Sequence, residues 1–224
     1  MPHSLLPTTL ALVLASSLVC STAIRHGHAD VPIAATAGQV TPLQAGDDAP
    51  RFTVRTVDDR PFEFDPLALE RAAVLISFRG GWCPYCNLHL SELRHVVPEL
   101  ADMGIDVLFL SGDRPGLLYA GLARETQEDI AGLDYTILSD ADAQAAMALG
   151  IAFEASAAAI DRLRDKGGDI EGSSMARQGV LPVPSVFVVD AGGRIVFAHV
   201  NADYKVRLAA QDLLAAATKA KAAD

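Results

Sequence analysis

The sequence predicts an α/β domain in which helices flank a central mixed β-sheet. Apolar runs that suit buried strands alternate along the chain with helical patterns. Residues 190–193 (Asp-Ala-Gly-Gly) separate two strand-like runs and predict a hairpin. Hydrophobic residues make up 50% of the chain and charged residues 21%, which is typical of a globular domain rather than a disordered one.

The first 29 residues are predicted to be a secretory signal peptide. The apolar run from Leu10 to Val19 is too short to span a bilayer comfortably, and Gly27-His28-Ala29 fits the small-x-small cleavage pattern. An uncleaved membrane anchor is the alternative. Cleavage would remove Cys20, and we expect an exported protein, periplasmic or secreted, with no stable membrane insertion after cleavage.

Residues 30–45 are rich in Ala, Thr, Pro and Gly and are predicted to be a flexible lead-in to a domain over 46–219. We expect order to begin near Asp48. Alternation over 51–57 predicts a half-exposed strand that pairs with 61–64.

A continuous apolar run over 72–78 predicts a central strand that is buried on both faces. Gly80-Gly81 breaks this strand. A helix is expected from Pro84 through Val97, because proline is favoured at the first helical position.

The second half of the chain continues the alternation. We expect a strand over 106–110, a helical segment over 115–131, a strand over 135–138, a short helix over 141–149, hairpin strands over 186–189 and 195–200, and a last helix over 204–220. Residues 151–181 are predicted to be an insertion beside the sheet, with an amphipathic helix over 157–164 and a Gly-rich loop over 167–179. No role for this insertion follows from its sequence.

The motif Trp82-Cys83-Pro84-Tyr85-Cys86 carries the predicted chemistry. Cys83 falls at the start of a helix, where unpaired N–H groups and the helix dipole stabilise a thiolate, so its pKa should fall below the free value of about 8.5. Cys86 lies one turn further on, within reach of a disulfide. We therefore predict a redox-active pair in which Cys83 attacks and the more buried Cys86 resolves. With Cys20 removed, two cysteines are too few for a structural zinc site.

These residues belong to a wider set of motifs that resembles the peroxiredoxin-like (AhpC/TSA) family of the thioredoxin fold. The matching stretches are residues 46–52, 77–87, 138–140, 182–190 and 198–204, followed by Arg207. The resemblance implies a thioredoxin-like (peroxiredoxin-like) fold over nearly the whole mature chain.

Departures from the family pattern make the predicted site a hybrid. Gly80 and Ile76 stand where main-type peroxiredoxins carry Thr or Ser and Pro, and these departures count against fast peroxide reduction. Pro184 stands where they carry an Arg, and it resembles the cis-proline of thioredoxins. Ser77 replaces the buried acid of thioredoxins.

Two arginines are the candidate positive partners of the Cys83 thiolate. Arg79 lies four residues upstream of Cys83 at the strand end, and the resemblance places Arg207 beside the reactive sulfur. A surface charge is the alternative for each. His89 and His95 are expected to be structural or solvated rather than catalytic, and Asp140 is expected to cap a helix.

The sequence therefore predicts an exported, thiol-dependent antioxidant oxidoreductase. The Cys83 thiolate would attack a peroxide and form a sulfenic acid that Cys86 resolves, and an external dithiol donor, a thioredoxin-like protein, would then reduce the pair without a metal or organic cofactor. One alternative is a thiol–disulfide oxidoreductase that attacks a disulfide sulfur, and another is a redox-inert binding domain with a structural disulfide. The net charge of −10 disfavours nucleic acid as a partner.

Overall fold

Strands and helices alternate through the part of the chain that the computed structural model describes, which is Met1 and residues 33–221. The predicted signal peptide and Cys20 therefore lie outside the described residues. The strands are β1 (Phe52–Arg55), β2 (Pro61–Phe64), β3 (Ala73–Phe78), β4 (Asp106–Ser111), β5 (Thr136–Ser139), β6 (Ala152–Glu154), β7 (Val180–Pro182), β8 (Ser185–Val189) and β9 (Ile195–Val200). The helices are α1 (Pro84–Leu93), α2 (Val97–Asp102), α3 (Arg124–Ile130), α4 (Gln144–Ala148), α5 (Ala157–Asp165), α6 (Ser174–Gln178) and α7 (Ala210–Lys221). Three short 3₁₀ helices are η1 (Ala37–Gln39), η2 (Pro66–Ala68) and η3 (Pro115–Leu117).

The main sheet has the strand order β2-β1-β5-β4-β3-β8-β9. Strand β3 lies parallel to β4 and antiparallel to β8, and β4 lies parallel to β5. Both predicted hairpins, β1–β2 and β8–β9, are present as antiparallel pairs. The sheet is therefore mixed, and the predicted fold class is confirmed.

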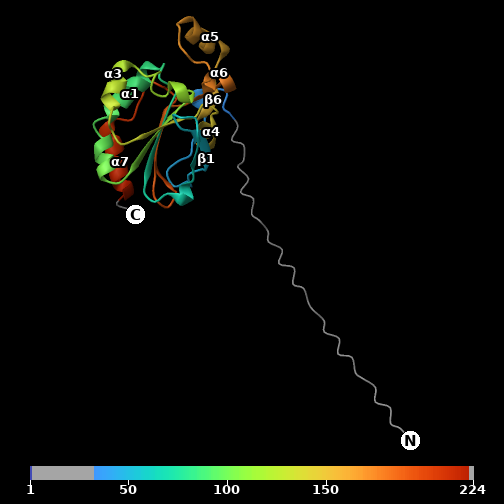
Figure 1. Cartoon of the computed structure of the whole chain (residues 1–224), viewed down its shortest axis with the longest axis vertical. Helices are drawn as coiled ribbons and strands as arrows, with labels where there is room; N and C mark the ends of the chain where they lie inside the picture. The colour runs from blue at the N-terminus through green and yellow to red at the C-terminus, as the bar shows by residue number, and fades with distance from the viewer. Residues whose placement is uncertain (2–32, 222–224) are drawn as a thin grey trace.

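Strand β3 runs through the core, and all six of its residues are buried. Val74, Ile76 and Phe78 pack on one side against the helices α1, α2, α3 and α7. Ala73 and Leu75 point to the other side, where β1, α4 and the 151–181 insertion cover the sheet. Figure 1 shows this division, with α1, α3 and α7 on one side and β1, α4 and β6 on the other. The continuous apolar run follows from burial on both faces.

The helix predicted from Pro84 through Val97 is two helices in the structure. Helix α1 ends at Leu93, and α2 begins at Val97 with a proline in its first turn. Pro98 has no N–H group to donate to the preceding turn, so a continuous helix would lose a hydrogen bond there. The helical pattern over 115–131 likewise divides into η3 and α3.

The last helix begins at Ala210 rather than at Tyr204. The preceding segment folds into turns: the Asn201 side chain accepts the Asp203 N–H at 2.9 Å, and the Asp203 side chain accepts the Lys205 N–H at 3.0 Å. Such local side-chain bonds compete with helix formation. The result is a loop over 201–209, which we call the arginine loop because it carries Arg207.

The described part of the lead-in differs from the predicted flexible segment. Ala34 pairs with the insertion, since its N–H donates to the Ala152 carbonyl at 3.1 Å and its own carbonyl accepts the Glu154 N–H at 2.8 Å. Val40 and Leu43 pack against the core on the β1 side of the sheet. Within the described residues, ordered pairing is thus already present at Ala34, upstream of the expected start near Asp48, because a sequence without periodicity still pairs along an available edge.

The insertion over 151–181 is built around a second, two-stranded sheet in which β6 pairs with β7. The predicted amphipathic helix is present as α5, which projects from the body in Figure 1. The predicted Gly-rich loop contains α6, and the first N–H of that helix donates to the Gly112 carbonyl at 2.8 Å. The insertion is thus fastened to the turn that follows β4.

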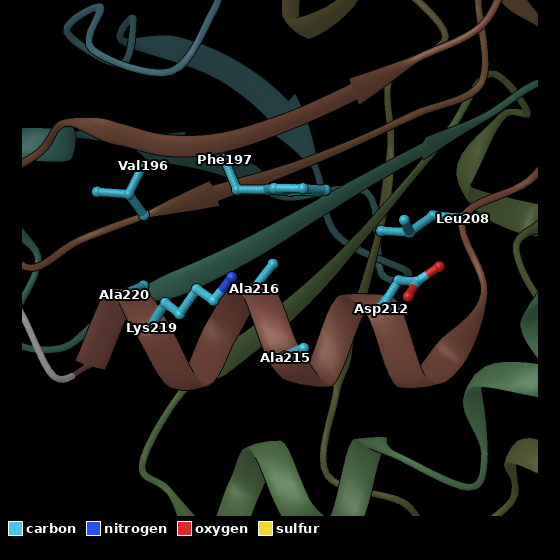
Figure 2. Close-up of a pocket in the computed structure, with 8 residues that line it drawn as sticks. All are labelled: Val196, Phe197, Leu208, Asp212, Ala215, Ala216, Lys219 and Ala220. Atoms are coloured by element: carbon cyan, nitrogen blue, oxygen red, sulfur yellow. The ribbon is translucent and has the colours of Figure 1, made fainter.

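A pocket of about 460 Å³ lies between the edge strand β9 and α7. Val196 and Phe197 approach it from the strand, and Asp212 and small alanines approach it from the helix (Figure 2). Neither cysteine lines this pocket, so it is separate from the predicted site. Within the described residues, none of the helices is long and apolar enough to cross a membrane.

Candidate active site

Two glycines carry the chain from β3 into the cysteine motif. Gly80 has a φ of +142°, and a Cβ atom there would lie 2.5 Å from Asp113 Oδ1. A Cβ atom on Gly81 would lie 2.3 Å from the backbone of Gly121. Only glycine fits such a turn. The turn places Cys83 at the N-cap of α1 and Pro84 at the first helical position, as predicted.

Two buried polar side chains bind the backbone of Gly81, one at its N–H group and the other at its carbonyl group. Asp113 Oδ2 accepts the Gly81 N–H at 2.6 Å, and Asn87 Nδ2 donates to the Gly81 carbonyl at 2.6 Å. Asn87 also donates to the Cys83 carbonyl at 3.0 Å and accepts the Ala123 N–H at 2.8 Å. Sequence reasoning assigned no role to either residue. The available signals were the position of Asn87 four residues after Cys83 and that of Asp113 directly after a buried strand.

The predicted pair consists of two free thiols, so the structure represents the reduced state. Cys83 is 2% exposed and Cys86 is 1% exposed. Both residues therefore lie beneath the surface, and Cys86 is the more deeply buried of the two.

The two thiols also differ in acidity. A hydrogen bond from the Cys86 thiol, followed by the Cys86 backbone and the charges of Arg207 and Arg79, lowers the pKa of Cys83 to about 6 against the opposing effect of burial. Burial, together with the bond to Cys83, raises the pKa of Cys86 well above its ordinary value. The lowered pKa favours the thiolate form of Cys83 at neutral pH. The pKa of Cys83 is lowered, as the sequence predicts. The largest cause of this lowering is the hydrogen bond from Cys86.

Arg207 reaches the site from the arginine loop. Its Nη2 donates to Cys86 Sγ at 3.5 Å, and its Nε donates to the Tyr85 carbonyl at 3.5 Å. The guanidinium therefore contacts the second sulfur and acts on the Cys83 pKa through its charge. The sequence expectation had named Cys83 as its partner.

His89 of α1 makes a hydrogen bond to the backbone of the arginine loop. The ring is 5% exposed, and Nε2 donates to the Leu208 carbonyl at 3.2 Å, next to Arg207. Burial lowers the pKa of His89 to about 4, so the ring is neutral at pH 7. The contacts of His89 are those of a structural residue. His95 is exposed.

Arg79 lies between aromatic rings near the thiols. Its guanidinium carbon is 4.4 Å from the centroid of the Tyr204 ring and 5.5 Å from that of Phe153. Tyr204 also meets Tyr85 edge to face, with ring centroids 5.6 Å apart. Burial lowers the pKa of Arg79, whereas the two nearby thiols raise it. Tyr204 and Phe153 were not predicted as neighbours of the site.

Pro184, whose position resembles that of the thioredoxin cis-proline, follows a trans peptide bond, since no cis peptide bond occurs among the described residues. Pro184 lies in the two-residue connection between β7 and β8. Pro184 is buried. Trp82, which precedes Cys83 in the motif, packs against the core on both sides of the sheet. Its Nε1 is buried and has no hydrogen-bond partner among the described residues.

A groove of about 820 Å³ opens beside the motif, between α1 and α3. Trp82, Pro84 and Leu88 supply apolar surface, and Glu92 and Glu125 lie further along it. Neither arginine of the site lines this groove. Within the described part of the chain, no group of three or more His, Cys, Asp or Glu side chains is arranged to hold a metal ion. Asp140 accepts the N–H groups of Ala145 and Ala146 at 2.9 Å each and so caps α4, as expected.

Solved structures share this fold. The reduced Prx3 of Vibrio vulnificus, in complex with hydrogen peroxide, superposes with a TM-score of 0.58 at 18% identity, over 78% of this chain and 99% of that one. The AhpC of Mycobacterium tuberculosis gives 0.58 at 16% identity, over 82% and 96%. At these identities the likeness concerns the fold.

Sequence comparisons give the family. The chain is 31% identical over 112 residues to peroxiredoxin Bcp of Escherichia coli (strain K12), covering 50% of this chain and 67% of that protein. It is 21% identical over 154 residues to the thiol-disulfide oxidoreductase ResA of Bacillus thuringiensis subsp. konkukian (strain 97-27), covering 69% and 68%. The model of the AhpC/TSA family matches residues 45–198, which include the cysteine pair. This chain therefore belongs to the AhpC/TSA family and is an oxidoreductase enzyme.

Proposed function

We propose that the protein is a thiol-dependent peroxidase in which Cys83 attacks the peroxide and Cys86 resolves the product. The observation that carries the proposal is the unequal acidity of two adjacent buried thiols. The pKa of Cys83 is lowered to about 6, and that of Cys86 is raised well above its ordinary value. One thiol is thus a nucleophile at neutral pH while its neighbour remains protonated.

The reaction has three steps. The Cys83 thiolate attacks one peroxide oxygen, so that an S–O bond forms, the O–O bond breaks, and the other oxygen leaves as water or an alcohol after taking up a proton. Cys86 then attacks the Cys83 sulfenic acid and releases water, which leaves a Cys83–Cys86 disulfide. An external dithiol donor of the thioredoxin type returns two electrons and restores both thiols.

Burial favours a small oxidant over a large one. With Cys83 only 2% exposed, hydrogen peroxide needs much less space to reach the sulfur than the disulfide of a folded protein does. The likeness to peroxiredoxin Bcp supports this choice. Arg207 and Arg79 supply positive charge that favours the thiolate, so we assign them thiolate-stabilising roles.

A thiol–disulfide oxidoreductase is the second candidate function. The likeness to ResA supports it, as does a motif that departs from main-type peroxiredoxins at Gly80 and Pro184. In this chemistry the Cys83 thiolate attacks a disulfide sulfur, and Cys86 resolves the mixed disulfide. Membership in a family of oxidoreductases counts against the third alternative, a redox-inert domain.

Stopped-flow mixing of the reduced protein with hydrogen peroxide, glutathione disulfide or oxidised insulin separates the two candidates. We expect peroxide to react fastest, and Cys86→Ser to react once and to accumulate a sulfenic acid that a dimedone-type trap captures. Cys83→Ser should not react. Faster reaction with the disulfides, or trapping in Cys83→Ser instead of Cys86→Ser, would overturn the proposal.

We also propose that residues 1–29 are a signal peptide and that the mature protein acts outside the cytoplasm. The apolar run Leu10–Val19 and the small residues that follow support this proposal. The intact mass of the protein recovered from the cell envelope or medium tests it. A mass that retains residues 1–29 contradicts cleavage.

A further inference from the structure

Arginines at the thiols have a different environment from arginines elsewhere. Ten described arginines lie within 4.0 Å of a carboxylate: Arg51, Arg55, Arg60, Arg71, Arg94, Arg114, Arg124, Arg164, Arg177 and Arg194. Within the described ranges, Arg79, Arg207 and the exposed Arg162 of α5 have no such partner. Two of these three exceptions lie beside the cysteine pair, in a chain whose net charge is −10.

These two guanidinium groups also keep unused donors. Arg79 Nε and Arg207 Nη1 are buried and have no hydrogen-bond partner among the described residues. Burial, and to a smaller extent the charge of Arg207, lowers the pKa of Arg79, while the Cys83 and Cys86 sulfurs raise it. The thiolate of Cys83 is therefore the negative charge that balances this pair of cations in the reduced state.

Oxidation removes that negative charge. When the proposed disulfide forms, Cys83 becomes neutral, and two guanidinium groups with free donors remain near the sulfurs without a negative partner. Guanidinium groups bind carboxylates through charge and paired hydrogen bonds. Resting on the proposed function, we infer that the oxidised protein uses Arg79 and Arg207 to bind the carboxylate of the thiol that reduces it.

Reduction of the Cys83–Cys86 disulfide consumes two equivalents of a carboxylate-bearing thiol. A first thiolate attacks the Cys83 sulfur, the Cys83–Cys86 bond breaks, and Cys86 leaves with the bonding pair and takes up a proton. The Nη2 donor of Arg207, 3.5 Å from Cys86 Sγ in the reduced state, favours this leaving group. A second thiolate attacks the mixed disulfide and departs as the external disulfide, which restores the Cys83 thiolate. The protein gains two electrons and the thiols lose two.

A charge series of small thiols tests the inference. The oxidised protein is mixed with 3-mercaptopropionate, 2-mercaptoethanol or cysteamine, and the rate per thiolate is corrected for thiol basicity with a slope of about 0.4–0.5. We expect 3-mercaptopropionate to exceed cysteamine by about tenfold or more at low salt. The preference should nearly vanish in Arg207→Met and persist in the matched control Arg162→Met.

Equal corrected rates in the wild-type protein, or a preference that survives Arg207→Met, would overturn the inference. If Arg207→Met does not fold, the wild-type preference measured at low and at 0.5 M salt replaces it. Salt should abolish the preference, because a Debye length of roughly 4–5 Å screens the partly exposed charges. A preference that is insensitive to salt overturns the inference.

Two further experiments separate this inference from the proposed peroxidase function and identify which thiol carries the carboxylate. Diamide prepares the disulfide even if peroxide does not, so failure of the peroxidase proposal is distinguishable from failure of the anion site. The carboxylate can belong to a small thiol or to an acidic segment of a thioredoxin-type donor. Excess propionate should inhibit reduction by thioredoxin if the donor protein uses the site. Small-thiol preference without such inhibition assigns the site to small thiols.

Discussion

Arginine has different effects at the outer surface and at the thiol end of α1. On the surface, Arg124 pairs with Glu128 at 2.9 Å while the two side chains remain 86% and 64% exposed. At the thiol end, Arg207 is half-buried and its described neighbours include a sulfur but no carboxylate. Water and salt screen the first kind of charge, whereas the second acts on an ionisable sulfur in a low-dielectric setting. The positive charge at the thiol end therefore has no described carboxylate within 4.0 Å to neutralise it, unlike the charge of Arg124.

The same contrast holds for uncharged polar groups. Gln127 makes one hydrogen bond, to the Leu122 carbonyl at 2.9 Å, at a partly exposed position. Asn87, which contacts the same loop, is 7% exposed and makes three side-chain hydrogen bonds. Buried polar groups at the thiol end are therefore expected to contribute more than their exposed counterparts.

The largest effect is expected for Asn87→Ala. Truncation leaves the Gly81 carbonyl and the Ala123 N–H without their buried partner, which should cost about 2–4 kcal/mol of unfolding free energy. Urea unfolding measures this loss as a lower transition midpoint at constant slope. The control Gln127→Ala should cost under about 1 kcal/mol. Equal losses for the two variants would remove the contrast between buried and exposed contacts.

The next effect concerns Asp113, whose pKa is raised to about 6 by burial against the opposing bond from the Gly81 N–H. The folded protein binds more protons at this carboxyl than the unfolded chain does between pH of about 4 and 6, so its contribution to stability falls as pH rises through that window. Asp113→Asn should therefore increase the unfolding free energy at pH 7.5 by about 1–3 kcal/mol. It should also flatten the pH profile between about 4 and 6.

Urea unfolding at several pH values checks this prediction. Asp134→Asn, at an exposed aspartate, serves as the control and should leave the profile unchanged. A decrease in stability for Asp113→Asn at pH 7.5 would mean that the charged form is what the Gly81 turn requires.

Arg207→Met should raise the Cys83 pKa by about one unit, which corresponds to about 1.4 kcal/mol. The rate of alkylation should rise with pH through the Cys83 pKa of about 6 in the wild type and through a higher value in the variant. Peroxide reduction at pH 6 should slow accordingly. Arg207→Lys should recover only part of the effect, because a point charge cannot reproduce the planar guanidinium. If both the pKa and the peroxide rate are unchanged, the charge of Arg207 has no role at the site.

The smallest effect is expected for Arg124→Ala, which removes the exposed ion pair with Glu128. Such pairs typically contribute 0.3–0.5 kcal/mol in a helix, so the transition midpoint should hardly move. The Cys83 alkylation profile should stay the same. A shift in that profile would show that surface charges reach the thiols, and the distinction between the two regions would then fail.

The local architecture of the cysteine motif could be predicted from the sequence because short-range rules determine it. The continuous apolar run of β3, the Gly80-Gly81 break and Pro84 together indicate a strand, a turn and a helix start, and Cys83 lies at that start in the structure. The β1–β2 and β8–β9 hairpins follow from equally local signals. The acidity of Cys83 was expected in direction for the same reason, since the N-cap position depends on the neighbouring residues.

Only the tertiary structure decided the contacts between residues that lie far apart in the chain. Arg207 lies 121 residues from Cys86, and its contact with that sulfur rather than with Cys83 depends on the path of the arginine loop. The stacking of Arg79 on Tyr204 and the hold of Asp113 on Gly81 depend on how β3, β4 and that loop end at one edge of the sheet. Short-range periodicity specifies each element, but the relative placement of elements results from burial of their apolar faces together. The partners of a buried charge or thiol are therefore known only once the core is assembled.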